Sequence, residues 1–363
     1  MVYLKKYFAP AAMAALALLA PRCAEDPSDS WQDTELQLIK STIRVHYPNA
    51  ESIEPDSSLW IIRHAKASGD GAKSPQDDGY VEFEYHGELL PISQRVVYQT
   101  TDSLEARRLG TFTSDKHYAP IFTLYSKDYT QAALYKALGQ MHEGDTLTVL
   151  SASWHAFSST GATGVAANTP VIFTVTLKEA LANADSAAAR ELRWVNDYVN
   201  TFNGRNANAA QFVPATDTAG TVQAGIYVRY IDTVQRNDTT LCAKTGDVLN
   251  LKYSGYYLRD GFLLDSNNGE DAGKAGWSVD TTTSTSTYYP TAYYAHTFSK
   301  ALLSTTSIKS FDIALLNIAE GSVVEVVFTS DYGYGATGTT TNASRPIYPY
   351  TPLRFKIAFV GIQ

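Results

Sequence analysis

The segment with the clearest chemical potential is a glycine- and tyrosine-rich stretch in the last part of the 363-residue chain. Residues 331–338 read Asp-Tyr-Gly-Tyr-Gly-Ala-Thr-Gly, and residues 347–355 read Ile-Tyr-Pro-Tyr-Thr-Pro-Leu-Arg-Phe. Because glycine tolerates positive φ, this stretch can turn sharply and hold its tyrosine rings over a neighbouring surface. An aromatic flap beside a strand predicts a shallow apolar pocket with a few hydroxyl donors.

Three further blocks supply the elements that would position this flap. After the flap, Leu353, Phe355, Ile357 and Phe359 alternate with less apolar residues, which is typical of a strand with one buried face. Upstream, residues 246–255 (Gly-Asp-Val-Leu-Asn-Leu-Lys-Tyr-Ser-Gly) and 260–266 (Asp-Gly-Phe-Leu-Leu-Asp-Ser) read as a strand, a turn and a second strand. Residues 314–327 read as the end of a helix followed by a strand.

In this order, the four blocks resemble the FKBP-type peptidyl-prolyl cis-trans isomerase family over roughly residues 225–363. The resemblance implies catalytic roles for Tyr253, Asp265, Tyr334 and Phe355, and substrate-binding roles for Phe298, Ile308, Phe311 and Ile347. Tyr334 would donate from the flap to a substrate carbonyl, and Asp265 would orient or polarise the pocket. Tyr253 and Phe355 would form walls, although simple core packing is an equal alternative for these two.

The implied reaction suits such a pocket. Rotation about a peptide bond before proline breaks amide resonance and is slow without a catalyst. An apolar aromatic pocket favours the twisted, less dipolar amide, and a few donors can hold its carbonyl oxygen. We therefore expect no cofactor and no metal. Phe311 stands where the family has Trp, Leu264 where it has Phe, and Ser307 where it has an apolar residue, so weaker or altered catalysis is an alternative.

The blocks occur twice. Residues 81–89 parallel 248–256, residues 137–149 parallel 314–326, and residues 169–175 parallel 351–357. A stretch with near-helical apolar spacing precedes each set, at 31–45 and 185–202. We therefore expect an α+β fold of two tandem FKBP-like domains, residues 34–184 and 185–363. Each would be an antiparallel sheet wrapped over a short helix and preceded by an N-terminal helix.

The expected core elements can be placed by residue number. Strands are expected at 59–63, 81–90, 94–100, 147–152 and 171–177, and at 225–231, 248–258, 262–266, 323–330 and 353–360. Helices are expected at 132–141 and 308–318. The insertion 278–295, rich in Thr, Ser and Tyr, is either an exposed hairpin or a loop.

The first domain matches the family's pocket less well. Tyr85 and Phe173 match, but Leu134 stands at the position of the helix aromatic. Phe157 replaces the flap tyrosine, and no Asp occurs around residues 98–100. We therefore expect any isomerase activity to reside in the second domain.

The first 22 residues resemble an export signal. Lys5 and Lys6 precede an apolar run at 11–20 that is too short to span a bilayer. Removing residues 1–22 removes three basic and no acidic residues, so the formal charge of −8 becomes 26 − 37 = −11. Cys23 lies where bacterial lipoprotein signals place the acylated cysteine, and residues 23–33 would form a polar tether. Since Arg22 departs from that pattern, a plain secretory signal, with Cys23 incidental or paired with Cys242, is the alternative.

Composition and spacing exclude several function classes. The acidic charge and the lack of a basic patch argue against a nucleic-acid partner. His86, His142 and His155 lack any short ligand spacing, and no nucleophile-elbow motif indicates a hydrolase.

Two functions remain. The leading one is a peptidyl-prolyl isomerase or folding helper that acts on proline-containing polypeptides or envelope proteins, anchored to the bacterial outer membrane by lipid. The alternative is a non-catalytic FKBP-like peptide-binding or docking subunit of an outer-membrane protein complex.

Overall fold

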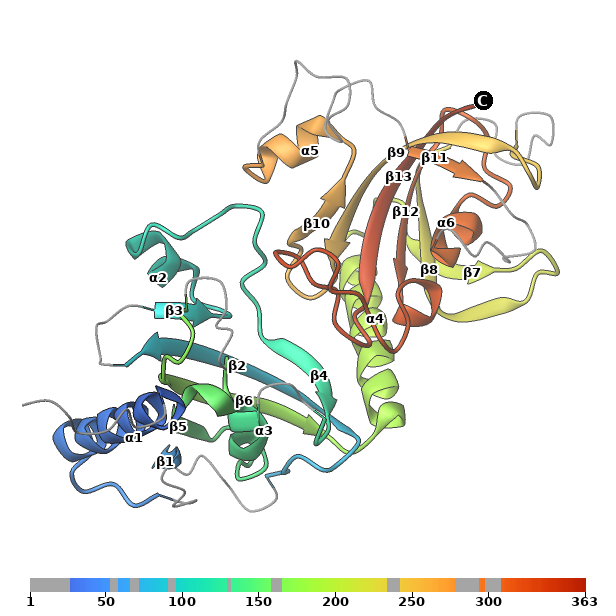
Figure 1. Cartoon of the computed structure of the whole chain (residues 1–363). Coiled ribbons are helices and arrows are strands. Elements are labelled where there is room, and N and C mark those ends of the chain that lie inside the picture. The colour runs from blue at the N-terminus through green and yellow to red at the C-terminus, as the bar shows by residue number, and fades with distance from the viewer. Residues whose placement is uncertain are drawn as a thin grey trace, which may run out of the picture.

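The computed structural model of the chain has two antiparallel sheets with both long and short helices beside them (Figure 1). It describes residues 27–52, 58–65, 72–90, 96–128, 132–157, 165–233, 242–277, 294–297 and 308–363. The α+β class expected from the sequence is confirmed. We call residues 27–183 the first unit and residues 184–363 the second unit.

The first unit is built around one sheet. Its strands lie in the order β1-β5-β6-β2-β3, and β4 also pairs with β2. Its elements are α1 (Pro27–His46), β1 (Leu59–Ala65), β2 (Gly79–Leu89), β3 (Val96–Gln99), α2 (Ser103–Arg108), β4 (Ile121–Tyr125), α3 (Ala132–Leu138), β5 (Thr146–Ser151), the 3₁₀ turn η1 (Ser153–His155) and β6 (Val171–Leu181).

The second unit follows without a break. Its strands lie in the order β10-β9-β13-β12-β8-β7, and β11 also pairs with β9. Its elements are α4 (Ala184–Arg205), β7 (Phe212–Thr216), β8 (Val222–Asp232), β9 (Val248–Tyr257), β10 (Leu263–Ser266), α5 (Gly269–Lys274), β11 (Tyr294–Thr297), α6 (Lys309–Ala314), β12 (Val323–Phe328), the 3₁₀ turn η2 (Ser330–Tyr332) and β13 (Leu353–Ile362).

The two sheets share a strand path and a register. The path β8-β12-β13-β9-β10 repeats β1-β5-β6-β2-β3, and β7 extends the second sheet beyond it. Gly87 of β2 pairs with Phe173 of β6, and Gly255 of β9 pairs with Phe355 of β13. The residues that carry the sequence repeat therefore occupy matching positions in the two sheets.

Each sheet has its own apolar core, because alternate strand residues face the short helix of that unit. In the first core, Leu134 and Leu138 of α3 are buried together with Phe83 and Phe173. In the second core, Phe311 and Leu315 are buried together with β12, β13 and β9 side chains. Burial of aliphatic and aromatic side chains on this scale is the main force that stabilises each unit.

Some boundaries differ from those expected. Helix α1 begins at Pro27, so residues 27–33 of the segment expected as a polar tether are helical. Proline is favoured in the first helical turn, where its missing N–H costs nothing. Helix α6 ends at Ala314 instead of 318, and Asn317 has a φ of 58°, a left-handed value that stops a helix. Strand β12 ends at Phe328 instead of 330, because the chain turns into η2.

Five short elements were not expected: α2, β4, β7, α5 and β11. Each has six residues or fewer, so local periodicity is a weak signal for them. The signal region 1–22, Cys23 and Phe298 lie outside the described residues, as does insertion 278–295 up to Tyr293.

The described ranges hold neither a membrane-spanning helix nor a cluster of metal ligands. Within them, no helix has the length and hydropathy needed to cross a membrane. Over the same part of the chain, no group of three or more His, Cys, Asp or Glu side chains is arranged to hold a metal ion.

Candidate functional site

A tyrosine–aspartate pair forms the polar edge of the site expected from the sequence. The hydroxyl of Tyr253 on β9 donates to Asp265 Oδ2 on β10 over 2.7 Å. The backbone amide of Ser266 donates to the other carboxylate oxygen over 2.9 Å. The backbone amide of Tyr253 donates to the side chain of Asn267 over 2.7 Å, which ties the two strands together. Asp265 is therefore held by donors on both of its oxygens.

Behind this pair lies a cluster of aromatic rings. The ring centroid of Tyr253 lies 5.8 Å from Phe311 and 5.9 Å from Phe355, and the rings of Phe311 and Phe355 meet edge to face at 5.2 Å. Phe311 and Phe355 are each 2% exposed, whereas Tyr253 is half-buried. The two phenylalanines thus form an apolar floor, and Tyr253 stands at its edge.

Gly255 makes room for that floor. A Cβ atom placed on Gly255 would lie 2.4 Å from the ring of Phe355, a separation that real Cβ atoms do not show. Only glycine lets the Phe355 ring lie across β9 at this point. Gly255, two residues after Tyr253, is therefore needed for the aromatic cluster to pack in this way.

Tyr334 lies on the turn that follows β12. The backbone amides of Gly333 and Gly335 both donate to the carbonyl of Ser330 over 2.8 Å, which closes the turn. Gly335 and Gly338 have φ values of 68° and 64°, in the left-handed region that glycine occupies at little cost. The side chain of Tyr334 is 36% exposed.

The remaining site residues expected from the sequence lie on the same side of the second sheet. Ile347 is buried in the second core with Phe355, and Ile308 packs against that core from the start of α6. The structure therefore brings together Tyr253, Asp265, Ile308, Phe311, Ile347 and Phe355, with Tyr334 on the adjoining turn.

The matching place in the first unit is built differently. Tyr85 is 6% exposed and meets Phe173 edge to face at 5.8 Å, and Phe157, 9% exposed, packs on Phe173 at 6.0 Å. Opposite Gly87, the register of β2 and β3 places Tyr98, whereas Asp265 stands opposite Gly255. The first unit therefore has no carboxylate at this register, and its three site aromatics are buried.

A pair of glutamates was missed by sequence reasoning. In the second unit, Glu191 of α4 accepts hydrogen bonds from both the backbone amide and the hydroxyl of Ser330. In the first unit, Glu35 of α1 accepts the same two bonds from Ser153, over 2.7 and 2.8 Å. Both glutamates are buried. Each unit thus fastens the start of its 3₁₀ turn to the helix that precedes its sheet.

Burial gives Glu191 unusual acid–base behaviour. It raises the pKa of Glu191 to about 7, and the two hydrogen bonds from Ser330 only partly oppose this rise.

A sequence signal for Glu35 and Glu191 does exist. Glu35 precedes the buried Ile39 by four residues and Glu191 precedes the buried Val195 by four, so both repeats place an acid on the buried helix face.

No family model matches the chain, and no curated protein matches it. The chain is similar to solved FKBP structures. The three FKBP domains of wheat FKBP73 match at 15% identity and a TM-score of 0.30, covering 87% of this chain and 99% of that one.

Two further structures cover less of the chain. A peptidyl-prolyl cis-trans isomerase from Pseudomonas syringae pv. tomato matches at 18% identity and a TM-score of 0.32, over 44% of this chain and 99% of that one. The N-terminal domain of FKBP42 from Arabidopsis thaliana matches at 15% identity and a TM-score of 0.28, over 36% and 93%. Because these TM-scores are low, the support for a function comes from the geometry of the second unit.

Proposed function

We propose that the chain is a tandem pair of FKBP-like domains, and that the second unit isomerises peptide bonds before proline. One observation carries the proposal. The Tyr253–Asp265 hydrogen bond lies at the edge of a buried Phe311–Phe355 floor, with the partly exposed Tyr334 on the adjoining glycine-rich turn. Tyr253 thus offers a half-buried aromatic edge, backed by buried rings and with few donors near it, which is what rotation about an amide requires.

Each side chain has a distinct part in the proposed reaction. The proline ring packs on the aromatic floor, where the twisted amide is favoured because it is less dipolar than the planar amide. The hydroxyl proton of Tyr253 is directed to Asp265, so Tyr253 holds the carboxylate rather than the substrate. Tyr334 then supplies the donor that follows the rotating carbonyl oxygen. No proton is transferred and no bond is broken.

A second candidate function is supported by the first unit. Tyr85 is buried where the corresponding Tyr253 is only half-buried, Phe157 lacks a hydroxyl, and Tyr98 stands at the register of Asp265. These features favour a binding or structural role for this unit. If the second unit were also inactive, the whole chain would be a non-catalytic docking subunit of an outer-membrane protein assembly.

The proposed setting is the bacterial envelope. A lipid anchor on Cys23 would hold the chain at the outer membrane, and the clients would be proline-containing envelope or secreted polypeptides. The support is the charged start, the short apolar run and the position of Cys23.

The test is a protease-coupled assay with a proline-containing peptide on the chain from residue 23 onward. Tyr334→Phe removes one neutral hydrogen-bond donor and should lower kcat/KM by roughly 2- to 10-fold. The matched control is Tyr85→Phe, which removes the hydroxyl at the position of Tyr253 in the first unit and should leave the rate unchanged. Peptide binding with no measurable isomerisation would overturn the enzymatic proposal and favour the docking subunit.

A further inference from the structure

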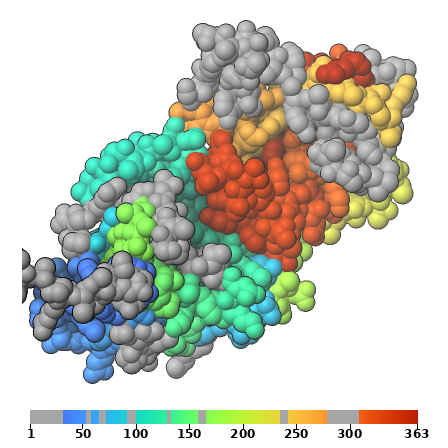
Figure 2. All heavy atoms as spheres, viewed as in Figure 1, coloured from blue at the N-terminus to red at the C-terminus, as the bar shows by residue number. Residues whose placement is uncertain are grey.

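One loop of the second unit contacts the first unit on both of its flanks. We call residues 333–352 the substrate loop, because they carry Tyr334 and Ile347. On one flank, the backbone amide of His117 in the first unit donates to the carbonyl of Ser344 over 2.8 Å. On the other, the ring of Tyr350 meets Tyr80 of β2 edge to face at 5.2 Å. Figure 2 shows the C-terminal segment, in orange-red, lying against the teal segment of the first unit.

Tyr350 is anchored among side chains of the first unit. It is buried in a cluster with Tyr80, Phe122 and Leu181, together with Ala187 of α4. Its φ is 50°, a left-handed value that is uncommon and costly for a bulky residue. Such a backbone persists only where its surroundings hold it, and here those surroundings come mainly from the first unit.

His117 reaches the same loop by a second route. Its ring stacks on Tyr257 at a centroid distance of 3.9 Å, and its Nε2 lies 2.7 Å from Asp260 Oδ2. The hydroxyl of Tyr257 in turn donates to the carbonyl of Pro346 over 2.9 Å. Pro346 directly precedes Ile347, which is buried in the second core with Phe355. His117 of the first unit therefore supports Tyr257, and Tyr257 holds the loop at Pro346.

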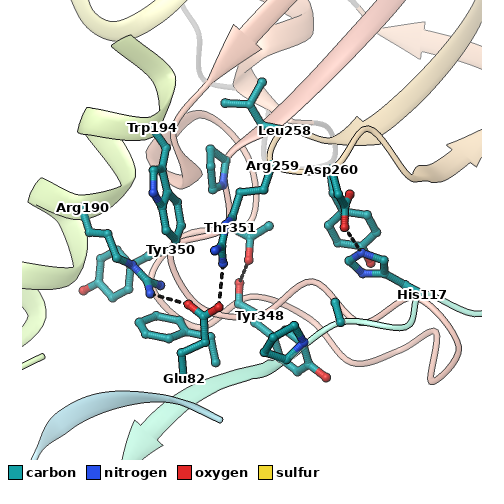
Figure 3. Close-up of a pocket in the computed structure, with 15 residues that line it drawn as sticks. Glu82, His117, Arg190, Trp194, Leu258, Arg259, Asp260, Tyr348, Tyr350 and Thr351 are labelled. Carbon is teal, nitrogen blue, oxygen red and sulfur yellow. Dashed lines mark hydrogen bonds and ion pairs between the residues drawn. The ribbon is translucent and has the colours of Figure 1, made fainter. Parts of the chain in front are cut away.

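A cavity separates these two contact points. It has a volume of about 260 Å³ and lies between the units (Figure 3). The substrate loop supplies Tyr348 and Tyr350 to its wall, and the first unit supplies Pro120, Phe122 and His117. Tyr348 also packs against the cluster that holds Tyr350, so the loop contacts the first unit on this side of the cavity as well as at Ser344.

A buried ion-pair network keeps the two units in one orientation. Glu82 of β2 accepts from Arg190 of α4 over 2.8 Å and from Arg259 over 2.7 Å. The side chains of Glu82 and Arg190 are 7% and 3% exposed. The guanidinium groups of both arginines lie 4.2 Å from the ring centroid of Trp194 (Figure 3). Separating the units would break the Glu82–Arg190 and Glu82–Arg259 pairs and leave Arg190 with Glu179 alone, so this network opposes their separation.

We propose that the first unit is a positioning platform for the substrate loop, and that Tyr80 and His117 are the positioning residues that set its conformation. This inference rests on the proposed function only where it predicts a change in the rate of prolyl isomerisation. Within one loop, Ile347 packs into the second core while Tyr350 packs into the first-unit cluster. A change in docking therefore moves the backbone that carries Ile347 and that leads back to Tyr334.

The test uses the chain from residue 23 onward with Tyr80→Ala and His117→Ala. Amide hydrogen exchange within residues 333–352 should become roughly tenfold faster in each variant, while β9 and β13 keep their protection. If the second unit is an isomerase, kcat/KM should also fall by a similar factor. A purely structural role would instead accelerate exchange throughout the second sheet.

The matched control is Tyr135→Ala. Tyr135 also belongs to the first unit, where its ring stacks on Tyr125 at 4.6 Å and its hydroxyl donates to Asp77 over 3.0 Å. Both of these partners lie within the first unit as well. This variant should therefore leave exchange in the substrate loop unchanged.

The outcomes separate the two proposals. Unchanged loop exchange in both variants would overturn the platform, whatever the activity of the chain. Faster loop exchange with an unchanged rate in an active chain would overturn the claim that the platform affects catalysis. Faster loop exchange in a chain that shows no isomerisation would support the platform and overturn the proposed enzymatic function. Should Tyr80→Ala unfold the first unit, His117→Ala decides, because His117 lies in the segment between α2 and β4 outside the sheet.

Discussion

Glu191 of α4 accepts hydrogen bonds from both the backbone amide and the hydroxyl of Ser330, the residue that opens the turn carrying Tyr334. Glu35 and Ser153 repeat this arrangement in the first unit. The helix before each sheet therefore anchors the turn after the matching strand. In the second unit, this anchor lies just before the substrate loop, and the first-unit contacts lie within the loop at Ser344 and Tyr350.

The Glu191 anchor predicts a pH dependence. Burial raises the pKa of Glu191 from 4.5 to about 7, so the folded chain binds this proton more tightly than the unfolded chain. The associated stability is fully present below pH 4.5 and is lost as the pH rises through about 7. Relative to Glu191→Gln, the wild type should therefore lose roughly 1–3 kcal/mol of unfolding free energy between pH 5 and pH 8. Urea unfolding at the two pH values measures this.

The control for that experiment is Glu270→Gln. Glu270 is an exposed carboxylate on α5, and its hydrogen bond from Lys274 lowers its pKa, so it does not titrate in this window. Parallel pH profiles for wild type and Glu191→Gln would show that Glu191 stays ionised in the folded chain.

The Tyr253–Asp265 pair predicts a larger loss of rate than Tyr334→Phe. Asp265→Ala removes the acceptor of the Tyr253 hydroxyl and of the Ser266 amide. Hydrogen bonds to charged groups contribute about 1.5–3 kcal/mol, so kcat/KM should fall by roughly 10- to 100-fold. The double variant with Tyr253→Phe should lose less than the sum of the two single effects, because the partners act as a unit. Additive effects in the peptide assay would contradict the pairing.

Gly255 predicts a steric effect on stability. A Cβ in Gly255→Ala would meet the Phe355 ring at 2.4 Å, so the ring must move. Overpacking of this kind costs about 1–3 kcal/mol and should lower Tm and disturb the aromatic floor. Gly204→Ala is the matched control, since Gly204 lies in α4 with no heavy atom within 4 Å of its added Cβ. It should be neutral or stabilising by about 0.5–1 kcal/mol.

The Glu82 network predicts that loss of an interface charge lowers the unfolding free energy more than loss of a surface charge does. Glu82→Ala leaves Arg190 buried with Glu179, 2.6 Å away, as its remaining partner. Loss of one partner of a buried pair costs about 3–5 kcal/mol, and Glu179 should place this loss near the lower end. Disruption of the exposed pair Glu105–Arg108 by Glu105→Gln should change little. Equal unfolding midpoints for the two variants would argue against a stabilising interface.

The anchor prediction concerns Cys23. Cys23→Ala should move the protein from the membrane fraction to the soluble fraction of cells that express the full chain, because acylation requires the cysteine thiol. Cys242→Ala is the control and should fractionate as wild type does. Unchanged fractionation of Cys23→Ala would remove the lipid anchor from the proposal.

The sequence by itself determined the features that depend on local pattern. Alternation between residues 353 and 359 defined β13 and its buried face, and the spacing of Tyr253 and Gly255 marked the strand that pairs with it. The same spacing at Tyr85 and Gly87 revealed the matching strand of the first unit. These features are readable because side chains alternate along any strand, whatever lies beyond it.

Only the tertiary structure decided the contacts between segments far apart in the chain. Glu191 and Ser330 are 139 residues apart, and His117 and Asp260 are 143 apart. The left-handed backbone of Tyr350 also has no local signature, because a bulky residue adopts it only when surrounding side chains hold it. Local patterns define the faces of strands and helices, whereas the packing of two completed units determines which of those faces meet.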